Sequence, residues 1–355
     1  MLRARNLWWL VALGAFGVFP LVVTNPTYTT IAVFSVIYMA CASSWNMFSG
    51  YSGYIALGSA GFYGSGAYTM ALLSIHLHMA PGAAMFWLVP LGGLVATVLA
   101  VPIGWIALRV RRHTFVVITI AIFFVFQLSA INFGFTGGTS GLNLPFITWG
   151  YQYYNVPFYY VGLGLVIVAT VLSALVRRSR FGMQLLAIRD DEDRALGLGV
   201  RTHAVKVTGF ALSAFTVGAA GALYAMFVGQ IYPQFVYDPM FDISIALMTF
   251  LGGLGTLSGP LLGGLVLEAG QQYLTIQFSN GSLYLILFGA LFLLVIMFMP
   301  QGVVVYIRDR VTRRAERERA AVSANDAEAG DAPTGAGGPP APAGLASDVA
   351  IGGAA

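Results

Sequence analysis

The chain has 355 residues, of which 58% are hydrophobic and only 9% are charged, and its mean hydropathy is +0.79. Soluble globular proteins carry about 25% charged residues, so this composition excludes an ordinary cytosolic enzyme and indicates a protein surrounded by lipid. The formal net charge of +4 does not indicate nucleic-acid binding, because the basic residues fall in separate clusters between apolar runs rather than in one stripe.

Apolar runs predict an all-α membrane protein with about ten transmembrane helices, each near the roughly 20 residues that cross the hydrocarbon core. We place these runs at residues 7–23, 28–48, 55–79, 84–108, 114–133, 157–176, 207–228, 240–254, 258–274 and 283–306. The first run lacks a clear small-residue cleavage site, so residues 1–27 are predicted to form an uncleaved anchor. The two short runs within 240–274 fit either two crossings or one re-entrant pair.

The positions of the basic residues predict the orientation of the chain. Ten crossings place every Lys and Arg on one side, and the positive-inside rule makes that side the cytoplasm. Both termini are then cytoplasmic. The clusters are Arg3 with Arg5, Arg109 to Arg112, Arg177 to Lys206, and Arg308 to Arg319. Residues 134–156 form the one longer external segment, and their glycines and hydroxyls predict a turn-rich cap.

The end of the chain and its rare residue types limit the chemistry further. The tail at residues 306–355 becomes rich in Ala, Gly and Pro, which predicts a cytoplasmic segment that is mostly disordered. The single cysteine, Cys41, permits no intrachain disulfide. The single lysine, Lys206, follows Val205 rather than the glycine of a phosphate-binding loop. We therefore expect no nucleotide, metal or cofactor site and no enzymatic activity in this chain.

Two glycine-rich segments are candidates for a translocation pathway. They read GYSGYIALGSAGFYGSGAY at residues 50–68 and GGLGTLSGPLLGG at residues 252–264. On a helix, Ala56, Ala60 and Gly64 share one face, and Pro260 is expected to interrupt the hydrogen bonding of the second segment. Freed backbone groups at membrane depth are tolerated only where protein or water meets them. Close helix packing is the alternative explanation for these glycines.

The pathway candidates include one acidic residue, and the glycine-rich segments hint at a repeat. The candidates are Gly50, Tyr51, Gly58, Tyr63, Gly64, Gly255, Gly259 and Glu268.

At an offset of 200 residues, Gly53, Leu57 and Gly64 match Gly253, Leu257 and Gly264. Such a match indicates an internal repeat or follows from the abundance of Gly and Leu.

Two acidic residues lie within predicted spans, where charge is expensive and often functional. Glu268 and Asp242 could serve an ion-coupled secondary transporter as proton or cation sites. Alternatively, Glu268 anchors helices through a hydrogen bond to Gln271 or Gln272, one turn further along.

The polar loop at residues 177–206 has the pattern of a short projecting helix. We expect Asp190 to cap its start, with three further acids in the first turn, and Gly197 or Gly199 to end it. Apolar side chains alternate with the charges, which favours a protein-docking surface over a merely solvated loop.

Several segments, in this order, resemble the permeases of branched-chain amino acid ABC importers, and the M-type subunit more than its H-type partner. The resemblance covers about residues 28–305. It is carried by SGYSGYIALGSAGFYGSGAYTMALL, GGTSGL, RSRFGMQLLAIRDDEDRALGLGV, GFALSAFTVGAAGALYA and TFLGGLGTLSGPLLGG.

The resemblance implies an ABC-importer permease fold at residues 28–305 of a bacterial inner-membrane protein. It also implies four partners: an H-type permease, two ATPase subunits that bind ATP and Mg, and a periplasmic or lipid-tethered solute-binding protein. Related permeases serve branched-chain amino acids, but also urea, short amides and other amino acids. We expect branched-chain amino acids.

By the same resemblance, the loop contains the coupling helix that docks on an ATPase. The family's acidic-Ala-Ala core appears here as Asp193-Arg194-Ala195-Leu196-Gly197, with Arg194 in place of the first Ala. The implied coupling residues are Ala187, Arg189, Asp190, Asp193, Arg194, Ala195, Gly197 and Gly199.

Overall fold

A computed structural model describes residues 14, 16–23, 25–145, 150 and 154–277, together with 286, 289, 290 and 293. The chain divides into two units, residues 1–307 and 308–355, and every described residue belongs to the first. The tail at residues 306–355 and most of the tenth predicted span at 283–306 lie outside the described residues, as does the start of the predicted anchor.

Helices are the main secondary structure of the described residues, which include one pair of two-residue strands. This confirms the all-α fold class. The helices are α2 (Pro26–Trp45), a π-helical turn (Asn46–Gly50), α3 (Ser59–His76), α4 (Leu88–Ala107), α5 (Arg112–Asn132), α6 (Asn155–Arg178), α7 (Arg180–Asp190), α8 (Glu192–Gly197), α9 (Thr202–Val228), α10 (Pro233–Val236), α11 (Pro239–Gly252) and α12 (Gly259–Gln277). Three 3-10 turns (Ala83–Trp87, Gly134–Thr136 and Gly138–Ser140) and strands β1 (Leu142–Asn143) and β2 (Gln230–Ile231) complete the fold.

Many helices are long and apolar enough to cross a membrane, as a multi-pass protein requires. Among the described residues, 6 stretches meet this criterion: Pro26–Gly50, Ala83–Ala107, Arg112–Asn132, Asn155–Arg178, Thr202–Val228 and Pro233–Gly252. Helices α3 and α12 coincide with two further predicted runs. The total of ten crossings stays a prediction.

The starts of two helices follow directly from local sequence. The side chain of Asn25 accepts a hydrogen bond from the Thr27 amide at 3.0 Å, and Pro26 is the first residue of α2. The side chain of Asp238 likewise accepts from the Met240 amide at 2.9 Å, before Pro239 at the start of α11. Proline suits this first position because its missing N–H would have no partner there.

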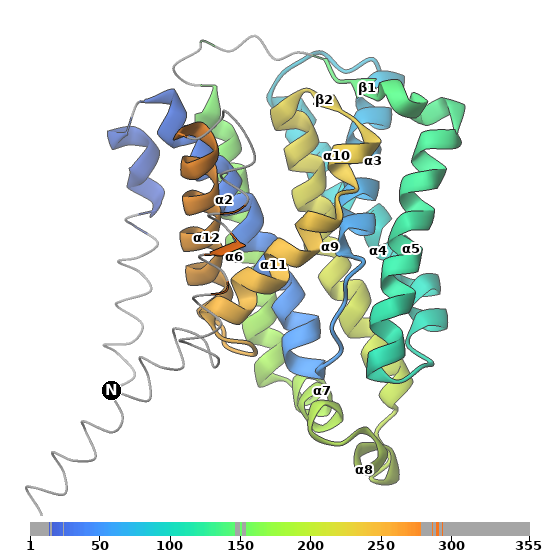
Figure 1. The fold of residues 1–355 in the computed structure, drawn as a ribbon. Coiled ribbons are helices and arrows are strands. Elements are labelled where there is room, and N and C mark those ends of the chain that lie inside the picture. Colours follow the sequence, from blue (N-terminus) through green and yellow to red (C-terminus); the bar gives the residue numbers. More distant parts are fainter. Residues whose placement is uncertain are drawn as a thin grey trace, which may run out of the picture. The chain divides into compact units, whose positions relative to one another are not determined.

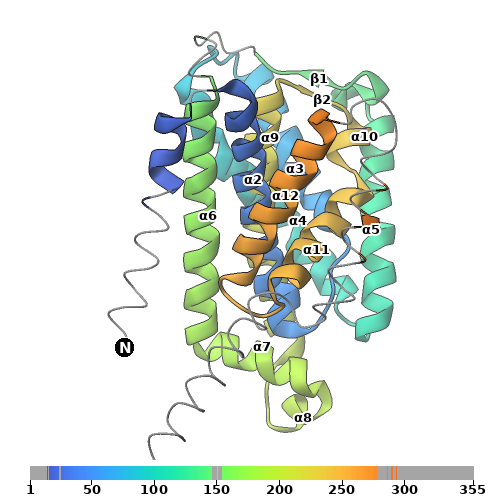
Figure 2. The same cartoon turned by 60° about the vertical axis from the view of Figure 1, so that its left-hand side comes forward.

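Helices α2 and α9 are the most buried of the long apolar helices, and Figure 2 shows α6 and α5 at opposite edges of the bundle. Helix α9 is buried along 78% of its most apolar stretch, whereas α5 is buried along only 22%. Small residues allow α3, α4 and α9 to approach closely. A Cβ on Gly66 would overlap the carbonyl oxygen of Gly218, so the backbones of α3 and α9 meet here without side chains between them.

The two ends of the bundle differ in structure, as Figure 1 shows. Helices α7 and α8 lie together at one end, which we call the loop end. At the opposite end β1 pairs antiparallel with β2, Leu142 opposite Ile231. The described part of the 134–156 segment thus contacts the turn after α9, and positive φ at Gly137, Gly138 and Gly141 confirms that it is rich in turns.

Two helices of the bundle begin after non-helical segments of equal length, which we call the first and second breaks. Residues 53–58 and 253–258 are not helical, and α3 and α12 start 200 residues apart, at Ser59 and Gly259. Each break opens on a glycine with positive φ, +73° at Gly53 and +117° at Gly253. The 200-residue offset noted in the sequence thus recurs as two non-helical segments of equal length that each precede a helix. Whether these segments form an internal repeat or interrupt a membrane span stays a prediction.

The breaks correct two sequence expectations. Ala56 lies in the first break, so it does not share a helical face with Ala60 and Gly64. Pro260 is the second residue of α12, where an amide has no partner within the helix. The interruption therefore comes from residues 253–258 and not from the proline.

A Gly66→Ala substitution tests the close contact of α3 with α9. We expect it to lower the free energy of unfolding by about 1–3 kcal/mol, because the added methyl group overpacks the interface. Thermal unfolding of the purified protein in detergent measures the effect. Gly164→Ala on α6 is the control, since open space surrounds that position. Equal melting temperatures for the two variants would contradict the packing described.

Candidate functional site

Helices α7 and α8 form the predicted coupling loop, with one change in how α8 is capped. Asp191 has extended backbone between the two helices, and its side chain accepts a hydrogen bond from the Arg194 amide at 3.0 Å. Asp190 is instead the last residue of α7. The expected cap at Asp190 is therefore wrong by one residue, because α7 continues through Asp190 and only Asp191 leaves helical geometry.

Gly199 ends α8. Its φ is +84°, and the amides of Gly199 and Val200 donate to the carbonyls of Leu196 at 2.9 Å and Ala195 at 3.1 Å. These two bonds form the common helix ending that requires a left-handed residue, usually glycine. Gly197 is the last residue of α8, and open space surrounds it.

The outward face of α8 carries both apolar and charged side chains. Leu196 and Leu198 are 60% and 86% exposed, although neither is at a lipid-facing position of a long helix. Asp193, Arg194 and Gly197 are also exposed, whereas Ala195 is buried against the protein. Two exposed leucines on a charged projecting loop fit a surface that a partner protein covers.

The inner side of α7 is held by two arginines. Nη2 of Arg112, at the start of α5, donates to the carbonyls of Ile188 at 2.6 Å and Arg189 at 2.7 Å. These carbonyls belong to the last turn of α7, where they have no partner within the helix. Nη1 of Arg189 in turn donates to the Gly50 carbonyl at 2.8 Å. Helix α7 is thereby attached to the end of α2 and to the start of α5.

A charged cluster attaches α8 to α9 and to the first break. Nζ of Lys206 lies 2.6 Å from Oε1 of Glu192 and 3.1 Å from the Tyr54 hydroxyl, and that hydroxyl donates to Oε2 of Glu192. The Lys206 side chain is 4% exposed and that of Glu192 27%. Burial and the hydrogen bond to Glu192 raise the pKa of Tyr54 above its ordinary value, so the hydroxyl keeps its proton.

Sequence reasoning did not identify this cluster. Glu192 was expected to serve only the first turn of α8, and Tyr54 is separated from it by 138 positions. The one available signal was compositional, because Lys206 is the single lysine among 18 basic residues.

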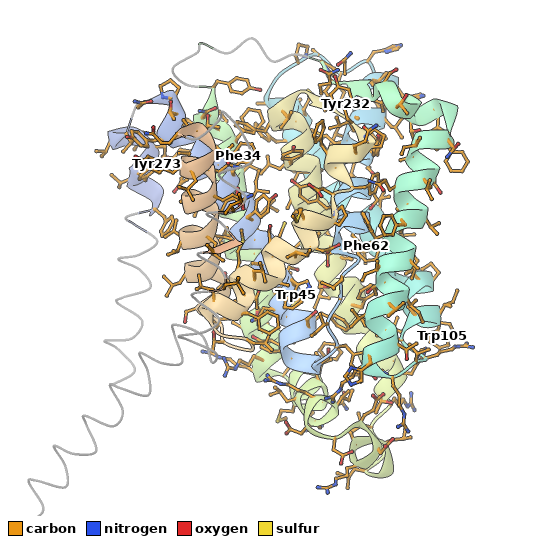
Figure 3. All side chains as sticks on the ribbon, in the orientation of Figure 1. Phe34, Trp45, Phe62, Trp105, Tyr232 and Tyr273 are labelled. Atoms are coloured by element: carbon orange, nitrogen blue, oxygen red, sulfur yellow. The ribbon has the colours of Figure 1, made fainter. Side chains whose placement is uncertain are left out.

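Side chains satisfy the backbone groups that the two breaks expose. Asn46 bridges to the second break, because its Nδ2 donates to the Thr256 carbonyl and its Oδ1 accepts from the Gly255 amide, both at 2.7 Å. Nε1 of Trp45, which Figure 3 labels, donates to the Ala56 carbonyl in the first break at 2.7 Å. The end of α2 therefore contacts both breaks.

Asp242 caps α3 from the neighbouring helix α11. Its carboxylate accepts hydrogen bonds from the amides of Ser59 at 2.8 Å and Ala60 at 3.2 Å, and the residue is buried. An acidic side chain is favoured at this end of a helix by the free amides and by the helix dipole. Asp242 thus has a partner for its charge in the fold itself.

Glu268 is also buried, and it makes the contact with Gln272 that the sequence suggested. Nε2 of Gln272 donates to Oε1 of Glu268 at 2.9 Å. Oε2 of Glu268 has no hydrogen-bond partner among the described residues. Whether this acid contacts a solute stays a prediction.

The other pathway candidates have packing contacts. A Cβ on Gly50, Gly58, Gly64 or Gly259 would overlap Asn46, Thr119, Tyr237 or Thr256 respectively. At Gly255, with φ +77°, a Cβ would approach Nη1 of Arg189. The Tyr51 hydroxyl bonds to Ser173 on α6 at 2.8 Å, and the Tyr63 ring lies 4.3 Å from that of Phe241. Close packing thus accounts for these residue types, and their place in a pathway stays a prediction.

Comparison with known proteins identifies the family. Residues 27–296 match the model of a family described as branched-chain amino acid transport system, permease component. The chain belongs to this family. It is 27% identical over 334 residues to the high-affinity branched-chain amino acid transport system permease protein LivM of Escherichia coli strain K12, a match that covers 85% of the chain and 76% of that relative.

Two further relatives show which member type the chain is similar to. The LivM protein of Salmonella typhimurium is 27% identical over 79% of the chain and 71% of its own length. The LivH protein of the same organism is 30% identical, but over only 37% of the chain and 42% of its own length. No solved structure gives a significant match. The chain is therefore a transport subunit, a multi-pass permease similar to LivM over most of its length.

Substitutions at Asp242 distinguish a role as a helix cap from a role as an ion-binding site. We expect Asp242→Asn to keep transport, because an amide oxygen still accepts the Ser59 and Ala60 amides. Asp242→Leu should destabilise the protein by about 1–3 kcal/mol for each buried amide left unpaired. Solute uptake and thermal unfolding measure the two effects. A stable Asp242→Asn protein without transport would favour the ion-coupled alternative.

Proposed function

We propose that this chain is one permease subunit of an ATP-driven importer that moves branched-chain amino acids across the bacterial inner membrane. The observation that carries the proposal is the α7–α8 loop, whose exposed leucines and charges project from one end of a family permease. A transporter without its own nucleotide-binding loop needs energy from a partner, and this surface is suited to receive one.

The proposed complex contains an H-type permease, two ATPase subunits that hold ATP and Mg, and a solute-binding protein outside the membrane. The similarity to both LivM and LivH relatives supports a pair of related permeases. In this orientation the loop end and both termini lie in the cytoplasm, consistent with the basic residues Arg112 and Arg189 at the loop end.

Coupling in this proposal is a shift between conformations. Closure of the ATPases on nucleotide would displace α7 and α8, and the displaced loop favours one of two permease states, open inward or open outward. The loop is suited to this role because α7 and α8 are bonded to the protein through side chains on their inner faces, leaving Leu196, Leu198 and Gly197 free for the partner.

A Gly197→Phe substitution tests docking on the ATPase subunits. Open space surrounds Gly197, so the added ring should leave the fold intact and obstruct the partner. We expect less ATPase to co-purify with the tagged permease and transport to fall. Gly82→Phe is the control, because that glycine also has open space but follows α3 at the opposite end. Full ATPase recovery and uptake with Gly197→Phe would contradict the docking assignment.

The substrate is tested by uptake into vesicles that contain the whole complex. We expect ATP-dependent accumulation of leucine, isoleucine and valine, which unlabelled urea does not reduce. Accumulation of urea without leucine would reject the substrate assignment while keeping the ATP-driven mechanism. Leucine uptake by the isolated chain with a proton gradient and without ATP would reject the mechanism itself.

A further inference from the structure

The side chains on the inner face of the α7–α8 loop contact the two breaks, which are the non-helical segments 53–58 and 253–258. Glu192 on α8 bonds to Tyr54, which is the second residue of the first break. Arg189 on α7 bonds to the Gly50 carbonyl, and its Nη1 lies beside Gly255 in the second break. A single side chain of the loop thus reaches each break from the helices that are proposed to dock on the ATPase.

We propose that Lys206, Glu192 and Tyr54 form a transmission linkage, which carries a displacement of α8 to the first break and to α3. The inference rests on the proposed function, because it names the residues through which docking acts on the membrane domain. All three are positioning residues, and none is assigned contact with solute or nucleotide.

The geometry of the linkage favours movement as a unit. Lys206 belongs to α9, a central helix of the bundle, and it lies over the Tyr54 ring with Nζ 4.5 Å from the ring centre. The ammonium group directs two of its hydrogen bonds to Glu192 and to Tyr54, and Glu192 closes the triangle by accepting from the Tyr54 hydroxyl. A shift of Glu192 therefore changes the partners of both other groups at once.

Stability is a weaker explanation for this charge pair. The Lys206 side chain is 4% exposed and that of Glu192 is 27% exposed. Taking the ammonium out of water costs free energy that its pairing offsets only in part, and a well-packed apolar replacement is often as stable. What a paired charge does supply is a defined arrangement that is lost when either partner moves. The compact ammonium of lysine also offers three donors, a geometry that the planar fork of arginine does not reproduce.

Beyond Tyr54, the chain itself and the cap at Asp242 lead to the second break. Residues 53–58 lead into α3, whose first amides bond to Asp242 on α11. Helix α11 then ends at Gly252, directly before the second break. Side-chain hydrogen bonds at Tyr54 and Asp242, joined by residues 53–58 and by helix α11, thus connect α8 to both breaks, as transmission requires.

The test uses the complete complex in vesicles, with both permeases, both ATPases and the binding protein. Lys206→Met keeps the length of the side chain and removes the charge, and Tyr54→Phe removes only the hydroxyl. Thr208→Val is the control on the same helix, because Thr208 is exposed and bonds only within α9. The readout is leucine imported per ATP hydrolysed, measured with ATPase co-purification.

The expected result is normal ATPase co-purification and hydrolysis, with leucine per ATP lowered about tenfold in Lys206→Met, less in Tyr54→Phe, and unchanged in Thr208→Val. A tenfold change is within the usual range of coupling between sites. Unchanged leucine per ATP in both linkage variants overturns the proposal. If Lys206→Met fails to assemble, Tyr54→Phe alone decides in the same way. A wild-type complex that hydrolyses no ATP during import would instead refute the proposed function.

Discussion

Inside a membrane protein, a backbone N–H or C=O group outside a helix must form its hydrogen bond with another part of the protein. The fold depends on how the two breaks meet this constraint. The residues of the breaks, 53–58 and 253–258, lack the regular backbone hydrogen bonds of a helix. Asn46 and Trp45 supply partners from the end of α2 and the turn after it, and Asp242 on α11 caps α3 directly after the first break. Because these side chains come from other helices, the breaks also fix how α2, α3, α11 and α12 pack.

The same constraint explains why the α7–α8 loop can influence the membrane domain. A break held by a few side-chain bonds offers fewer obstacles to rearrangement than a continuous helix. From the loop, Glu192 bonds to Tyr54 in the first break and Arg189 lies beside Gly255 in the second, while Leu196 and Leu198 remain exposed on the outer face. Docking and response therefore use opposite faces of the same short helices.

Local sequence predicted the elements well, because apolar runs, prolines and glycines act over a few residues. The 200-residue offset was visible in the glycine-rich segments, although the exact place of each break was not, and Gly199 was one of two glycines expected to end α8. The cap of α8 was misplaced by one residue, since four consecutive acids offer equivalent candidates. The contacts of Tyr54 with the Lys206 cluster and the role of Asp242 were not predictable, because these partners are 138 to 183 positions apart and meet only in the folded bundle.

Amide hydrogen exchange of the assembled complex tests whether the loop and the two breaks respond together. We expect ATP to change the exchange of residues 53–58 and 253–258 as well as that of α7 and α8, because one set of contacts joins them. In the Lys206→Met complex the nucleotide effect on residues 53–58 should be lost. A nucleotide effect confined to α7 and α8 in the wild-type complex would contradict the account.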